Sequence, residues 1–84
     1  MVDAKGRSVD VNPRMMQALV AMAKAGPIQI NALTGGVHSH NSRHYSGHAV
    51  DLATQVGNAR QIENIARQYG GRRNNERTHI HLSF

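Results

Sequence analysis

The chain contains no cysteine, and at 84 residues it is too short to rely on a large hydrophobic core. Disulfide bonds therefore cannot staple the fold, and a cysteine-based zinc site is excluded. The remaining candidate for extra stabilisation is a metal ion held by histidine and carboxylate ligands. The length fits one domain over 1–84, in which we expect the polar residues 1–11 to form a loose N-terminal arm.

Ten lysines and arginines outnumber five acids, so the formal net charge is +5. This balance indicates an anionic partner, such as nucleic acid, a membrane surface or a cell-wall polymer. Nucleic-acid binding usually adds exposed aromatic side chains for stacking, and this chain has only Tyr45, Tyr69 and Phe84. The sequence shows no secretory signal and no run of transmembrane length. We therefore expect any role outside the cytoplasm to need another delivery route or a longer parent protein.

The segment 12–26 is predicted to be a helix because both of its ends are marked. Asn12 can cap the start and Pro13 suits the first turn, while Gly26 can close the helix before Pro27. A broad apolar face, which we expect to fill the core and not to line a cofactor site, consists of Met15, Met16, Leu19, Val20 and Met22.

A second helix is predicted after Asn58, which can cap it, and Gly70 and Gly71 can end it. Its apolar face has the spacing of one helical side and consists of Ile62, Ile65, Ala66 and Tyr69. The segment that follows contains three basic residues, Arg72, Arg73 and Arg77. We interpret this segment as a loop that is either solvated or in contact with a substrate.

Three short segments have the alternation of half-buried strands, namely 28–33, 49–53 and 78–84. In the middle one, Val50 and Leu52 are predicted to share one face, with Asp51 on the other. The order of elements predicts an α+β fold with a small, mostly antiparallel sheet and two packed helices.

The histidines gather in two places. Four lie within 38–48, and the other two, His79 and His81, share one face of the last predicted strand. The acid Asp51 lies between apolar residues, where an unpaired charge would be costly to bury and a nearby cation would offset that cost. His44 precedes it by seven residues, and Gly47 allows the loop between them to turn back. A catalytic zinc site needs three such ligands and a fourth position for water.

Two motifs carry a specific resemblance. The pattern S-x-H-x-x-G-x-A-x-D is matched by Ser42, His44, Gly47, Ala49 and Asp51, and H-x-H is matched by His79 and His81. Together they resemble the signature of the zinc peptidases typified by D-Ala-D-Ala carboxypeptidases, phage endolysins, lysostaphin and sonic hedgehog. The resemblance covers roughly residues 28–84 and implies a fold of the hedgehog/DD-peptidase type. It also implies one Zn²⁺ ion held by His44, Asp51 and His81.

The resemblance allows two assignments of the third zinc ligand and the catalytic base to residues of this chain. The second histidine of an H-x-H pair is the usual ligand in related enzymes, which favours His81 over His79. Some relatives instead place an acidic base three residues before the ligand, which would make Glu76 the base and His79 the ligand. Under either mapping zinc activates a water molecule, and Glu76 and His79 are the candidates to accept its proton.

The sequence departs from the family pattern after the first predicted strand. Many relatives have a G-Y-R-S segment there, whose arginine contacts a substrate carboxylate or backbone, whereas this chain has G-G-V-H-S. The departure favours an endopeptidase over a strict carboxypeptidase. Alternatively, His38 or Arg43 binds the substrate in place of the family's arginine. We expect His40 and His48 to be solvated or to pack within the loop.

The resemblance implies a zinc metallopeptidase that hydrolyses stem or cross-bridge peptides of bacterial peptidoglycan. We expect a monomer that acts at the cell wall, without nucleic acid or membrane insertion, delivered by a phage or as a domain of a larger exported protein. The alternative is a catalytically idle zinc-containing binding module of the same fold. A basic nucleic-acid-binding module would explain neither the His–Asp spacing nor the H-x-H strand.

Overall fold

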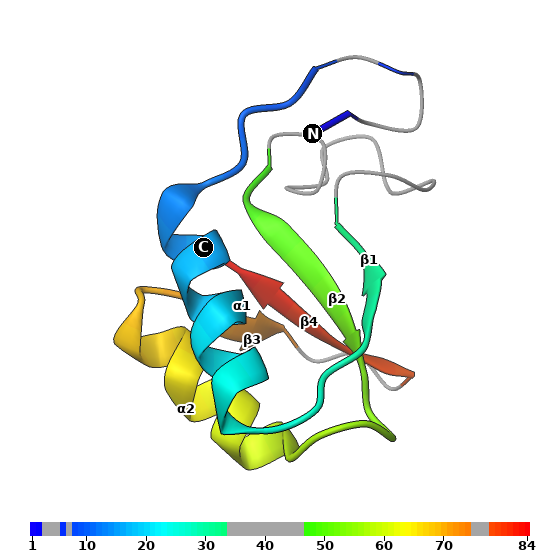
Figure 1. Ribbon diagram of the computed structural model, residues 1–84, viewed down its shortest axis with the longest axis vertical. Helices are drawn as coiled ribbons and strands as arrows, with labels where there is room; N and C mark the ends of the chain where they lie inside the picture. Colours follow the sequence, from blue (N-terminus) through cyan, green and yellow to red (C-terminus); the bar gives the residue numbers. More distant parts are fainter. Residues whose placement is uncertain (3–5, 7, 34–46, 75–77) are drawn as a thin grey trace.

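The computed structural model describes residues 1–2, 6, 8–33, 47–74 and 78–84. Two helices pack against a four-stranded antiparallel sheet, which confirms the predicted α+β class (Figure 1). The elements in chain order are α1 (Pro13–Ala25), β1 (Ile30–Ala32), β2 (Ala49–Ala53), α2 (Ala59–Gln68), β3 (Arg72–Asn74) and β4 (His79–Ser83). Within the described residues, no helix has the length and apolarity needed to cross a membrane.

Helix α1 begins and ends where its sequence predicts. The Asn12 side chain accepts a hydrogen bond from the backbone N–H of Arg14 at 2.9 Å, and the N–H of Gly26 donates to the Met22 carbonyl at 3.1 Å. The buried residues of the helix are Met15, Ala18, Leu19 and Met22. The apolar pattern also places Val20 on this face, but Val20 is 51% exposed because the buried stripe of the helix is narrower than the apolar face that the sequence predicts.

Helix α2 also follows its predicted pattern. The Asn58 side chain accepts a hydrogen bond from the Gln61 N–H at 3.1 Å, and Ile62 and Ala66 are buried. After the helix, Gly70 adopts a φ of 85°, a left-handed conformation that suits glycine. The glycine stop is therefore confirmed.

The segment after α2 differs from its prediction. The sequence predicts a loop here, but Arg72–Asn74 forms the edge strand β3, antiparallel to β4. Its residues have no apolar alternation, so the sequence contained no strand signal. Pairing with β4 decides its conformation because the partner strand supplies the backbone hydrogen bonds.

The strand order is β1-β2-β4-β3, so β2 and β4 occupy the centre of the sheet. The predicted strand 28–33 is shorter in the structure, and an irregular register between Ile30 and Ala32 leaves Ile30 45% exposed. Edge position and this bulge explain why Ile30 is not half-buried as its alternation predicted.

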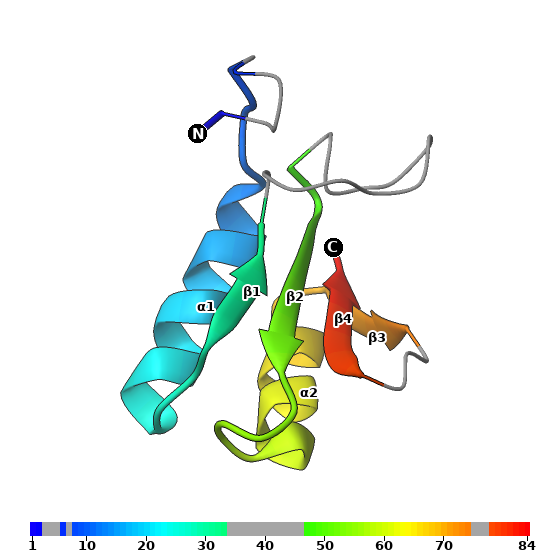
Figure 2. The ribbon, with the colours of Figure 1, turned by 90° about the vertical axis from the view of Figure 1, so that its right-hand side faces the viewer.

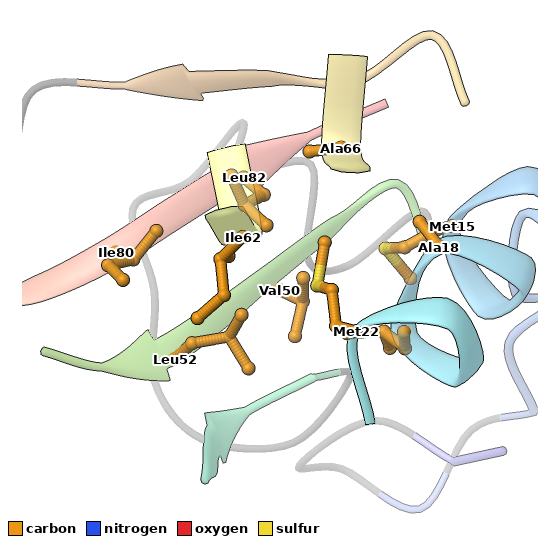
Figure 3. Packing of buried hydrophobic residues seen from close by; sticks show 10 residues of the cluster. Met15, Ala18, Met22, Val50, Leu52, Ile62, Ala66, Ile80 and Leu82 are labelled. Atoms are coloured by element: carbon orange, nitrogen blue, oxygen red, sulfur yellow. The ribbon is translucent and has the colours of Figure 1, made fainter. Parts of the chain in front are cut away.

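The two helices cover one face of the sheet, and the hydrophobic core lies between the helices and the sheet (Figures 2 and 3). Val50 and Leu52 point from β2 into this core, where they meet Ile80 and Leu82 of β4. Alternation along the strands places Asp51, His79 and His81 on the opposite face, which we call the polar face. The predicted separation of Asp51 from its apolar neighbours is therefore confirmed.

The N-terminal residues that are described make backbone contacts. Val2 and Ser8 form an isolated antiparallel bridge, and the Val9 N–H donates to the Met1 carbonyl at 2.8 Å. Further along, the Asn12 N–H donates to the carbonyl of Gly47 at 2.9 Å. The start of α1 is thus tied to the residue that leads into β2.

Candidate metal centre

Asp51 and His81 face one another across the two central strands. They are register partners in the β2–β4 pair, and the Nδ1 of His81 lies 2.7 Å from the Oδ1 of Asp51. Asp51 is 8% exposed, so its carboxylate is largely removed from water. A buried carboxylate is tolerated where polar or cationic groups compensate for its lost hydration.

His79 brings a second imidazole to the same carboxylate. Its Nε2 lies 3.4 Å from Asp51 Oδ1, and its ring centroid is 6.4 Å from that of His81. The Nδ1 of His79 lies 3.0 Å from the hydroxyl oxygen of Thr78. If Nδ1 donates its proton to the Thr78 hydroxyl, the Nε2 lone pair points to the same side as the Asp51 carboxylate, where both acceptors could coordinate one cation.

The three side chains offer ligand atoms that all lie within 4.8 Å of one another. Two imidazole nitrogens and one carboxylate oxygen are donors that zinc accepts. Tetrahedral zinc with bonds of about 2.0–2.1 Å separates neighbouring ligand atoms by about 3.3 Å. The 3.4 Å separation between His79 and Asp51 has this value, whereas the 2.7 Å contact between His81 and Asp51 is shorter. The residues therefore fit a metal ion that replaces the hydrogen bond between Asp51 and His81.

The predicted site residues divide into two groups. Asp51, His79 and His81 are brought together by the β2–β4 pairing. The others lie outside the described residues, namely the predicted ligand His44, the candidate base Glu76 and the predicted substrate contacts His38 and Arg43. His48 is described and half-buried, and its carbonyl accepts a hydrogen bond from the Phe84 N–H at 2.8 Å.

The glycine and alanine positions of the motif shape the approach to Asp51. Gly47 has a φ of 75°, and a Cβ atom at this position would collide with the carbonyl oxygen of Asp10. Ala49 and Ala53, which lie on the same side of β2 as Asp51, are buried. These small residues leave Asp51 as the only long side chain that β2 places on the polar face.

Sequence reasoning missed two neighbours of the centre, Thr78 and Asn74. Thr78 directly precedes the H-x-H pair, and its hydroxyl contact to His79 depends on rotamers that a pattern does not encode. Asn74 is the register partner of His81, but it lies in the strand that the sequence did not reveal.

Comparison with protein-family models, with curated proteins and with solved structures found no match to this chain. The family resemblance therefore rests on the motifs alone, and a hedgehog/DD-peptidase-like fold stays a prediction.

Proposed function

We propose that this protein is a zinc-dependent peptidase that hydrolyses peptide bonds of bacterial peptidoglycan. The observation that supports the proposal most is the convergence of Asp51, His79 and His81 on one sheet face. The sequence adds His44, placed seven residues before Asp51 as in the zinc peptidase motif. The formal charge of +5 suits an anionic wall polymer.

In this proposal the ligands are Asp51, His44 and one histidine of β4. A zinc ion held by these residues would supply Lewis-acid polarisation of the scissile carbonyl and a lower pKa for a coordinated water. The remaining histidine of β4, or Glu76, accepts the proton of that water and passes it to the leaving amine. Thr78 holds the ring of His79 through Nδ1, which aims the opposite nitrogen at the centre.

A second candidate function follows from the short distances of both histidines to Asp51. If His44, Asp51, His79 and His81 all bind the ion, four protein ligands fill a tetrahedral site and no position remains for water. Such a closed centre would stabilise the fold without catalysing hydrolysis. This is the idle binding module, and the number of protein ligands separates it from the peptidase.

Alanine variants of the two histidines test which function applies. For a peptidase, one of His79→Ala and His81→Ala should lose zinc, while the other keeps zinc but lowers kcat by about 10²–10⁴ because it lacks the proton acceptor. If Glu76 is the base, kcat should fall less in the histidine variant that retains zinc, and it should fall more in Glu76→Gln. Zinc per chain is measured after dialysis, and hydrolysis is measured as amino groups released from purified peptidoglycan.

His48→Ala provides the matched control, because it removes an imidazole that the metal cluster does not include. It should keep both zinc and activity. If both β4 variants lose zinc and the parent chain releases no amino groups, the idle module is correct. A parent chain that retains no zinc and is indifferent to EDTA would contradict both functions.

A further inference from the structure

The edge strand β3 lies beside β4 (Figure 2). The polar face therefore continues from β4 onto β3. Asn74 is the register partner of His81, and Arg72 is the register partner of Ser83. Paired residues of antiparallel strands point to the same face, so Arg72 and Asn74 lie beside the metal centre. Arg73 pairs with the core residue Leu82 and belongs to the opposite face.

Asn74 is held in a defined orientation. The hydroxyl of Ser83, a residue only 3% exposed, donates a hydrogen bond to Asn74 Oδ1 at 3.3 Å. Because the oxygen of the amide is engaged, its nitrogen is directed to the other side with two N–H donors. Half-buried Asn74 thus offers donors one strand away from His81.

Arg72 adds a positive charge to this edge. Its side chain is exposed, and within the described ranges it has no ion-pair partner. A guanidinium presents its N–H groups as a planar fork that matches a carboxylate. The Arg72–Ser83 pair lies two residue pairs along the strands from the Asn74–His81 pair, a displacement of about 7 Å.

We propose that Arg72 and Asn74 form an anion subsite that binds a carboxylate of the substrate, and we name the pair the β3 subsite. The inference rests on the proposed peptidase function and specifies its substrate class. An extended peptide advances about 3.4 Å per residue, so the bound carboxylate lies about two residues from the cleaved bond. Once zinc is bound, the metal centre and Arg72 would both be positive, and together they would favour peptides with a free carboxylate at that distance.

Kinetics with stem peptides test the substrate class. Free carboxylates of the peptide are amidated one at a time, and each peptide is offered to the zinc-loaded chain and to its Arg72→Gln variant. Arg72→Gln should raise KM about tenfold for the peptide with all carboxylates free, with kcat unchanged, because it removes a charge-assisted contact. In the parent chain, amidation of one particular carboxylate should raise KM by the same factor. In the Arg72→Gln variant, the same amidation should raise KM no further. Arg60→Gln, which changes an exposed arginine of α2, should leave KM unchanged.

Binding without turnover is measured by NMR titration of the same chain. The Arg72 Nε–H and Asn74 Nδ2 signals should shift with the free stem peptide and not with the peptide amidated at the critical position. If neither amidation nor Arg72→Gln changes KM for hydrolysis, the β3 subsite is wrong, while the peptidase function is unaffected. Specific shifts without any hydrolysis would refute the peptidase and leave the subsite standing. Shifts caused by glycerol phosphate but by no peptide would overturn the carboxylate assignment.

Discussion

At the residue scale, the candidate metal centre depends on Asp51 and on the side chains that surround it. Asp51 is placed opposite His81 by a register in which every residue of β2 has its partner in β4. A slip of one residue would move Asp51 into the core face and Val50 onto the polar face. The apolar contacts of Val50 and Leu52 therefore maintain the geometry of the candidate metal centre as well as the fold.

Gly47 is a motif residue whose backbone conformation and close contacts disfavour any side chain. The variant Gly47→Ala tests this requirement. Alanine at a φ of 75° costs about 1–2 kcal/mol, and its Cβ would also press on the backbone of Asp10 and on Val11 Cα at 3.0 Å. We expect the free energy of unfolding in urea to fall by about 2–4 kcal/mol.

Gly6→Ala is the matched control for this substitution. Gly6 has a similar φ of 78°, but among the described residues that do not adjoin it, no atom lies within 4 Å of the added Cβ. Its cost should not exceed about 1–2 kcal/mol, which is the backbone term alone. Equal losses for the two variants would show that the contact with Asp10 contributes nothing.

At the scale of elements, the helices have local start signals while the edge strands depend on neighbours. Both helices begin at an asparagine whose side chain accepts a backbone hydrogen bond within the first turn. β3 has no comparable local signal and exists because β4 pairs with it. The same dependence explains why β1 ends shorter than its alternation predicts.

Asn58→Ala measures how much the cap of α2 contributes. Loss of its hydrogen bond to the Gln61 N–H should lower the free energy of unfolding by about 1 kcal/mol. Asn64→Ala, an exposed change within the same helix, should be neutral or slightly stabilising because alanine has the better helix propensity. A larger loss for Asn64→Ala, seen in urea unfolding, would contradict the assigned cap.

At the scale of the whole molecule, a metal ion would join segments that are distant in sequence. Asp51 and His81 are separated by thirty residues and meet only through the central strand pair. A domain of this size buries a modest share of its surface, so a metal bound at the candidate centre would add a substantial part of its stability.

Zinc should therefore raise the melting temperature. At a free zinc concentration about 100 times Kd, linkage adds about 2.7 kcal/mol, which corresponds to roughly 10–20 °C in Tm for a domain of this size. Asp51→Asn keeps the shape of the side chain but removes its charge, and it should abolish the difference between zinc and EDTA. Scanning calorimetry of both chains under both conditions measures the effect. An equal Tm with zinc and with EDTA in the parent chain would contradict the metal centre.

The order of residues alone predicts the two helices, their caps, the faces of β2 and β4, and Asp51 with one of the two β4 histidines as candidate metal ligands. These features depend on local periodicity and on motif spacing, which the order of residues encodes directly. Three features come from the folded chain and not from local sequence: Arg72–Asn74 is a strand, Val20 and Ile30 are exposed, and both β4 histidines reach Asp51. These outcomes depend on which strand pairs with which and on side-chain rotamers, and both are set by contacts between residues far apart in the chain.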